Sequence, residues 1–289
     1  MTTGKRRMKQ VMALAMILLL TFGLTACGGD GAAANDPAAV VKAAQEKLAA
    51  VKSVSYEMTM AMNMSMGDEV LETTTTTTID SFTDPMKLKA DITTDMGDMG
   101  SMTILMYAGL EGEDMMMYIR ADGVNWMKQK ILDASALEQY SAQGSMEVYL
   151  ESMSGFKDAG AEKIGGKDAQ RYDGVIAEEY FNEVLANSGA LEQMEQYGIT
   201  EEEAAEIYKD LGSLPASIWI DKESSLPVCY KMDMTEMMSR LMSNMMEKLG
   251  AGQEAELSVD KVDITMNLYN FDSVADFEIP AEALNAAVQ

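Results

Sequence analysis

One short segment, residues 56–66, constrains the fold of this chain more than any other. After a tyrosine, every second residue is a methionine, and Glu, Thr, Ala, Asn and Ser stand between them. Side chains on a β-strand alternate between two faces, whereas a helical period of 3.6 would scatter the methionines around the axis. The segment therefore predicts a strand with one small polar face and one long apolar face, made by Tyr56, Met58, Met60, Met62, Met64 and Met66.

The purpose of this methionine face has three possible explanations. Methionine fills irregular gaps in an ordinary core, and it is also favoured where a surface must accept varied apolar partners. Thioether sulfur also suits Cu(I), but alternate residues of one strand lie about 7 Å apart, too far for one ion unless a second strand contributes. The sequence favours a lipid-lined cavity or a packed core over copper, and we expect no metal and no cofactor.

The N-terminus has the pattern of a targeting segment. A basic stretch at residues 5–9 precedes an apolar run at 11–20, and Leu24, Thr25 and Ala26 stand directly before Cys27. The apolar run is shorter than the roughly 20 residues that a transmembrane helix needs. The pattern resembles the lipobox of bacterial lipoproteins. That resemblance implies removal of residues 1–26, attachment of acyl chains such as palmitate through Cys27, and a location on the extracytoplasmic face of the cell membrane.

Charge limits the partners of the remaining chain. Removal of residues 1–26 takes away four basic and no acidic residues, which changes the formal charge from −25 to −29. Such a surface repels nucleic acid and anionic lipid, so we expect no nucleic-acid partner and membrane attachment only through the lipid on Cys27. Residues 27–35 form a short tether, and residues 36–289 are expected to form a single domain. Cys229, the other cysteine, then has no intramolecular disulfide partner.

The second predicted strand follows from a turn. Gly67 and Asp68 suit a two-residue hairpin with glycine first, which makes residues 69–82 the second strand. The resulting register pairs Met64 with Leu71, Met62 with Thr73, Met60 with Thr75 and Met58 with Thr77. The six threonines at residues 73–78 could instead form a disordered low-complexity tract. Their β-branched side chains and apolar flanks favour the strand.

Periodicity and turn residues predict the other elements. Asp36 is a candidate N-cap for a helix over residues 37–51. Further helices are predicted over 133–153, 178–185, 201–211 and 235–249. Further strands are predicted over 86–95, 101–108, 115–121, 124–131, 157–164, 169–175, 216–221, 228–234 and 258–271. This order predicts an α+β fold, a long curved antiparallel β-sheet (an incomplete barrel) with helices packed on its concave face.

Three short motifs then suggest a family. After the first helix comes Ser-Val-Ser-Tyr-Glu-Met at residues 53–58, followed by the meander, then Ile-Trp-Ile-Asp at 218–221 with Leu-Pro-Val at 226–228, and Phe-Glu-Ile-Pro at 277–280. This order resembles the LolA/LppX/RseB-like superfamily of lipoprotein-carrier domains. It looks closest to the uncharacterised LppX/LprG-type lipoproteins of Gram-positive bacteria. The resemblance implies helices closing over an apolar cavity that holds acyl chains.

Two features depart from that pattern. The methionine-rich helix over residues 235–249 is an insertion with no counterpart in the carrier pattern. LolA itself is a soluble shuttle, whereas a lipid on Cys27 would hold this protein on a membrane. The departure favours LppX-like or sensor-like roles over diffusion between membranes.

The sequence contains no complete catalytic motif of the families considered. The chain has no histidine, which excludes a Ser-His-Asp triad, a Cys-His pair and histidine-ligated zinc sites. Ser154 and Lys157 match Ser-x-x-Lys, but the companion motifs of penicillin-binding proteins are missing. The acidic residues at 111–114 follow no EF-hand pattern. We therefore expect a protein that is not an enzyme, and a buried Cys229 with no catalytic role.

The sequence thus predicts a membrane-anchored lipoprotein that binds a lipid, a lipoprotein acyl chain or another long apolar ligand. The alternative is an RseB-like envelope sensor or interaction scaffold with a filled core, acting on an unknown envelope partner. A cavity below the roughly 300 Å³ typical of ligand pockets would favour this alternative. The residues expected to line the ligand are Tyr56, Met58, Met60, Met62, Met64 and Met66, joined by Met102, Ile104 and Met106.

Overall fold

The computed structural model describes residues 36–67, 69–112, 114–121, 123–131, 150, 152–178, 200–248 and 257–288. Contacts between residues divide the chain into two units, Met1–Val40 and Val41–Gln289, and each is treated by itself. The predicted signal segment 1–26, the lipidation site Cys27 and the tether 27–35 lie outside the described residues. The same holds for nearly all of the helices predicted over 133–153 and 178–185.

Helix α3, Pro37–Ala49, confirms the first predicted helix. The Asp36 carboxylate accepts a hydrogen bond from the backbone N–H of Ala38 at 3.1 Å, which is the capping role expected of it. In the second unit, the apolar side of the helix is buried at Val41, Ala44 and Leu48.

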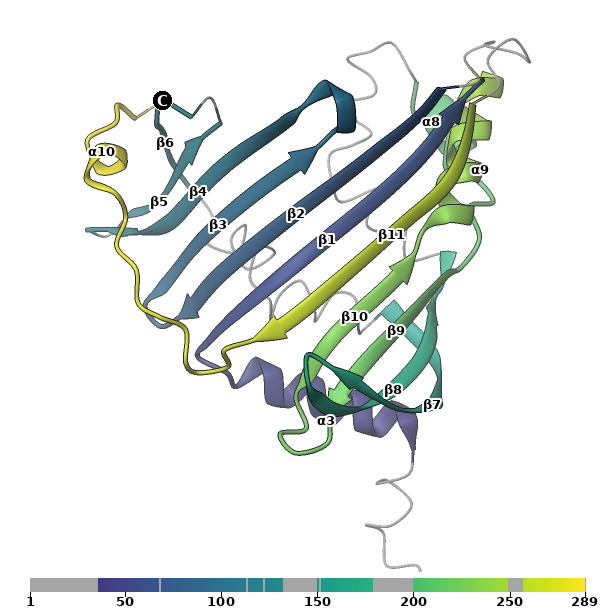
Figure 1. Cartoon of the computed structure of the whole chain (residues 1–289), viewed down its shortest axis with the longest axis horizontal. Helices are drawn as coiled ribbons and strands as arrows, with labels where there is room; N and C mark the ends of the chain where they lie inside the picture. Colours follow the sequence, from purple (N-terminus) through teal and green to yellow (C-terminus); the bar gives the residue numbers. More distant parts are fainter. Residues whose placement is uncertain are drawn as a thin grey trace, which may run out of the picture. The chain divides into compact units, whose positions relative to one another are not determined.

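In the described part of the chain, eleven strands form one antiparallel sheet, which confirms the predicted fold class (Figure 1). The sheet is curved and unclosed, and the order of its strands is β6-β5-β4-β3-β2-β1-β11-β10-β9-β8-β7. The strands are β1 Ser53–Met66, β2 Glu69–Thr83, β3 Met86–Asp95, β4 Ser101–Glu111, β5 Asp114–Arg120, β6 Met127–Lys130, β7 Met153–Ile164, β8 Lys167–Ile176, β9 Leu214–Asp221, β10 Pro227–Asp233 and β11 Leu257–Tyr269.

The first hairpin has the predicted register. Met64 pairs with Leu71, Met62 with Thr73, Met60 with Thr75 and Met58 with Thr77. Gly67 has a φ of 60°, as its place in a tight turn requires. The threonine run is part of β2, so the disordered alternative is wrong. Its side chains also join neighbouring strands, since the hydroxyls of Thr75 and Thr94 lie 3.0 Å apart.

The pairing of β1 with β11 unites two halves of the sheet. Met58 pairs with Met266 and Met60 with Ile264, so the last strand of the chain lies beside the first. The meander β1 to β6 extends from one side of this junction and β10 to β7 from the other. Turn residues specify only the pairing of strands that follow one another directly, such as the meander β1 to β6 and the hairpin of β7 and β8. The pairings of β8 with β9, of β10 with β11 and of β1 with β11 join strands separated by longer segments, and they were not predicted.

Several predicted boundaries are wrong. The strand expected over 124–131 is confined to Met127–Lys130, and the helix expected over 201–211 is the shorter α8, Glu201–Ile207. Strand β7 already begins at Met153, where a helix was expected. Helix α10, Ala281–Leu284, was missed. Helix α8 cannot reach residue 211 as predicted, because Asp210 and Gly212 have positive φ, which an α-helix does not accommodate.

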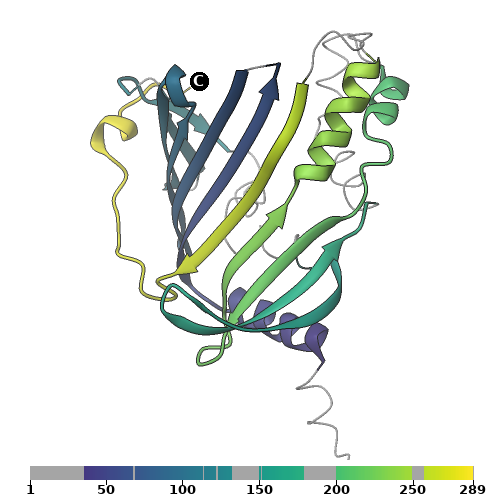
Figure 2. The same ribbon diagram turned by 45° about the vertical axis from the view of Figure 1, so that its right-hand side comes forward.

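The methionine-rich segment forms helix α9, Thr235–Lys248, as predicted. It packs against β11 and α8 (Figure 2). The Asn244 side-chain amide donates hydrogen bonds to the backbone carbonyls of Ile207 and Lys209, at 3.0 and 2.9 Å. Thr235 accepts a hydrogen bond from the backbone N–H of Val262 at 3.0 Å. These bonds fix the helix at the end of the sheet that carries the first hairpin turn.

Candidate ligand-binding face

The strand register carries the methionine face across the whole sheet. Met58 lies opposite Thr77, Thr77 opposite Ile92, and Ile92 opposite Ile104. Directly paired residues point to the same face, so Met102, Ile104 and Met106 share the face of the β1 methionines. In the other direction Met58 lies opposite Met266, which lies opposite Tyr230. The predicted residues therefore belong to one continuous, largely apolar surface.

Exposure varies along this surface. Tyr56 and Met106 are buried, at 3% and 8% exposure, and Met102 is 46% exposed. The four methionines of β1 from Met58 to Met64 and Ile104 are all half-buried. The side chain of Met66 lies outside the described part of the molecule. The β1 methionines are thus covered more than a free surface and less than a packed core.

At the Met58 end the face is closed. The cavity there has a volume of about 10 Å³, roughly the smallest space that holds one water molecule. The side chains around it come from β1 and from the five strands on the β11 side of the sheet. They are Met58, Met153, Ile176, Ala216, Tyr230, Met232, Ile264 and Met266. Curvature of the sheet brings these side chains together, and they leave no room for a ligand.

A tyrosine hydroxyl is buried at the closed end. Tyr230 is 5% exposed, and its hydroxyl has no hydrogen-bond partner among the described residues. Burial raises the pKa of this hydroxyl well above its usual value. A buried hydroxyl without a partner costs free energy, so this position stabilises the fold less than a phenylalanine of the same shape.

At the Met64 end the face opens into a pocket of about 630 Å³. Strand β2 extends past the end of β3. The last pair between the two strands is Thr74 with Asp95. A short 3-10 helix, η1 Gly97–Met99, takes the place of β3 beside the remaining residues of β2. The pocket lies at this notch, lined by Met64, Ser65, Glu69, Val70, Leu71, Glu72, Met96, Gly97, Asp98 and Met99.

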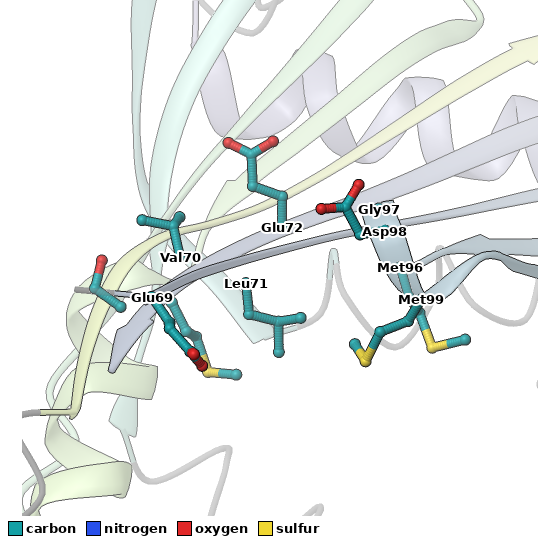
Figure 3. A pocket seen from close by; sticks show the side chains of 10 residues that line it. Glu69, Val70, Leu71, Glu72, Met96, Gly97, Asp98 and Met99 are labelled. Atoms are coloured by element: carbon teal, nitrogen blue, oxygen red, sulfur yellow. The ribbon is translucent and has the colours of Figure 1, made fainter. Parts of the chain in front are cut away.

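The lining of the notch is divided by chemistry. In Figure 3, Leu71, Met96 and Met99 project to one side of the β2 ribbon, and the carboxylates of Glu72 and Asp98 project to the other. Sequence reasoning named Met64 and missed these five. For Leu71 a signal existed, since the predicted hairpin register already placed it opposite Met64. For the residues of η1, the two nearby glycines, Gly97 and Gly100, were the only signal, and they indicated a turn but no pocket.

Among the described residues, the opposite face of the sheet carries charge networks and two small apolar clusters. Arg171 donates to the Asp173 carboxylate at 2.7 Å, and so does the Ser217 hydroxyl at 2.7 Å. Burial works against ionisation of Asp173, but these hydrogen bonds outweigh it and lower the pKa of that carboxyl. Trp219 donates to Glu162 at 3.0 Å. These contacts give the polar side chains of this face their hydrogen-bond partners and indicate no binding site.

Cys229 lies in one of those clusters, among Ala169, Trp219 and Val228. It is 1% exposed, and burial raises the pKa of its thiol to about 11. The thiol is therefore protonated at neutral pH, and the prediction of a buried, small apolar residue is confirmed.

The part of the chain that the structure describes contains no candidate metal site and no candidate membrane-spanning helix. No group of three or more acidic or cysteine side chains in this part of the chain is placed to hold a metal ion. No described helix combines the length and the apolar composition that a membrane span requires.

A family model described as a family of unknown function (DUF6612) matches residues 36–288. No curated protein matches the chain. Among solved structures, the lipoprotein LppX of Mycobacterium tuberculosis is 12% identical, with 86% of this chain and 100% of that one covered and a TM-score of 0.43. LprF of Mycobacterium bovis is 12% identical, with 86% and 97% covered and a TM-score of 0.45. A LolA superfamily protein of Nitrosomonas europaea is 9% identical, with 82% and 94% covered and a TM-score of 0.23. These are proteins of the kind that the sequence resemblance named, and the likeness is one of structure only.

Proposed function

Because this chain belongs to a family whose function is unknown (DUF6612), we propose from the geometry of its own residues that it binds a long apolar ligand on the methionine face. The ligand is a lipid, the acyl chain of a lipoprotein or a molecule of similar shape. The protein holds this ligand and does not transform it.

One observation carries the proposal. The half-buried methionines of β1 lead into a pocket of about 630 Å³ at Met64. This volume lies within the roughly 300–1,000 Å³ of typical small-molecule pockets. Each methylene that leaves water contributes about 0.8 kcal/mol, and flexible thioethers adapt to chains of different shape. Of the nine residues named from the sequence, six are proposed as the lining, with the pocket as the entrance: Met60, Met62, Met64, Met66, Met102 and Ile104. The other three, Tyr56, Met58 and Met106, are buried or lie at the closed end, where no ligand fits.

The proposed location follows from the N-terminal residues. The order of a basic stretch, an apolar run and Leu-Thr-Ala before Cys27 supports lipidation of that cysteine. The protein is then held at the extracytoplasmic face of the cell membrane, next to the lipids it binds. Changing Cys27→Ser is expected to move the protein from the membrane fraction to the soluble fraction and to abolish incorporation of labelled palmitate. Retention of both properties by the variant would contradict lipidation at this residue.

A second function is favoured by the closed end. The space at Met58 is only about 10 Å³, so the side chains there form a filled core. A filled core suits an RseB-like sensor or an envelope scaffold without ligand transfer. In that case the open pocket is an incidental surface feature, and partner proteins bind elsewhere.

Native mass spectrometry distinguishes the two functions. The full chain, purified gently from membranes, is expected to carry a bound lipid. Changing Met60→Asp and Met62→Asp together places two charges on the apolar face and is expected to remove that lipid. The control changes Thr59→Asp and Asn63→Asp on the opposite face of the same strand and is expected to keep it. Circular dichroism verifies that both variants fold. Wild-type protein without any bound lipid would favour the sensor or scaffold.

A further inference from the structure

The pocket at the notch joins the two faces of the sheet. Alternation along β2 places Glu69 and Leu71 on the methionine face and Val70 and Glu72 on the opposite face, yet all four line the same pocket. The pocket can do this because β3 is missing beside this part of β2. The hydrogen bonds of η1 are local, from Gly97 to the Asp95 carboxylate and from Gly100 to the Gly97 carbonyl. The turn therefore narrows the notch without closing it.

The charges around this passage have one sign. Its described lining includes three carboxylates, those of Glu69, Glu72 and Asp98, and no basic side chain. Among the residues that the structure describes, none of the three carboxylates forms an ion pair or a hydrogen bond. The nearest cation in the strand register, Lys261 opposite Asn63, is paired with Asp263 at 2.7 Å. Negative charge at the notch is thus available to a ligand.

The size and lining of the space favour an organic cation. The acidic side chains of the described segments include no group of three placed to hold a metal ion, while the space between them measures about 630 Å³. The same space is floored by four apolar side chains, Met64, Leu71, Met96 and Met99. An ammonium group near Glu72 and Asp98 would leave its attached chain on the methionine side of β2 (Figure 3).

We propose that the notch is the head-group site of a cationic amphiphile, a molecule with an amine or quaternary ammonium head on one long alkyl chain. The head lies between Glu72 and Asp98, and the chain passes through the notch onto Met64 and the β1 methionines. This inference rests on the proposed function, because it assigns the head group of the apolar ligand. Neutral and anionic amphiphiles of the same chain length bind more weakly.

Three probes with one alkyl chain test the proposal: decylammonium, 1-decanol and decanoate, each titrated calorimetrically into delipidated full-length protein below the critical micelle concentration. Decylammonium is expected to bind about fivefold more tightly than 1-decanol, which corresponds to roughly 1 kcal/mol at 1.4 kcal/mol per tenfold. Decanoate is expected to bind more weakly than 1-decanol. The preference for decylammonium is expected to shrink as salt is added.

Two matched variants separate this site from the general negative charge of the protein. Changing Glu72→Gln and Asp98→Asn is expected to abolish the preference and to leave 1-decanol binding unchanged. Changing Glu206→Gln and Glu247→Gln, two exposed positions on α8 and α9, removes the same charge and is expected to keep the preference.

The outcomes distinguish the two proposals. Equal affinity for the three probes, or loss of the preference in the Glu206 and Glu247 variant, overturns the head-group site and leaves the apolar ligand standing. Failure of all three probes to bind overturns the proposed function together with the head-group site.

Discussion

The two ends of one methionine row behave differently. At Met58 the row lies against a cavity of about 10 Å³, whereas at Met64 it borders one of about 630 Å³. The side chains are chemically identical and only a few residues apart on one strand. At Met58, side chains from five further strands line the same small cavity. At Met64, the neighbouring strand β2 continues beyond the end of β3, so no described strand lies on its other side. The neighbours, and not the methionines, decide whether the row is core or binding surface.

The largest expected difference between the two ends is in stability. Met266 is 4% exposed and lines the closed end, so Met266→Ala is expected to lower the free energy of unfolding by about 2–5 kcal/mol. Met64→Ala removes the same atoms beside open space and is expected to cost about 1 kcal/mol or less. Urea unfolding, with equal m-values as the control, measures both. Equal costs for the two variants would remove the distinction between a closed and an open end.

Alkaline pH probes the buried thiol behind the closed end. The pKa of Cys229 is raised to about 11 in the folded protein from 9.0. Since the raised value penalises ionisation only in the folded state, this thiol costs no stability well below pH 9. Its ionisation in the unfolded state lowers the stability as the pH rises from 9 toward 11. Compared with Cys229→Ala, the wild type is expected to lose about 2 kcal/mol more over this interval. Parallel pH profiles from urea unfolding of the two proteins would contradict a buried thiol.

Filling the open end is expected to affect binding and not stability. Leu71→Trp places a large side chain in the pocket, and the affinity for 1-decanol is expected to fall about tenfold, or about 1.4 kcal/mol. Leu110→Trp makes the same change at a site that is 53% exposed and lies outside the pocket, and is expected to leave the affinity unchanged. Calorimetry measures both affinities. Unaltered binding by the Leu71 variant would show that the ligand lies elsewhere.

The smallest expected effect concerns hydroxyl groups. Tyr230→Phe removes a buried hydroxyl that has no described partner, so the variant is expected to gain about 1 kcal/mol. Tyr118→Phe removes a hydroxyl that donates to Glu111 at 2.8 Å, and is expected to lose about 1 kcal/mol. Opposite shifts in the urea midpoint would sharpen the picture of a packed, dry closed end. A loss of stability in the Tyr230 variant would indicate a structural water there.

Local patterns predicted much of the sheet. The alternation from Tyr56 onward, a glycine at 67 and β-branched threonines were enough to give the first hairpin its register, because a strand and a tight turn are specified by adjacent residues. The observed register of the following strands places Ile104 and the methionines flanking it on the same face as Met58.

Other features needed information that neighbouring residues do not contain. The pairing of Met58 with Met266 joins residues far apart in sequence, and no turn specifies it. The notch arises because β2 is longer than β3. Met96 and Met99 line it because they follow the end of β3, and no periodic pattern in the sequence indicates that position. The closed end depends on sheet curvature, which sets how near Tyr230 comes to Met58.

Methionine methyl NMR reports which methionines of the row contact an apolar ligand. The full chain, labelled with carbon-13 at its methionine methyl groups and assigned by single substitutions, would be titrated with 1-decanol. Progressive shifts are expected at Met60, Met62 and Met64 and at Met96 and Met99, with Met58 and Met266 unchanged. Saturating ligand without shifts at the open end, or shifts confined to the closed end, would contradict ligand binding at the open end.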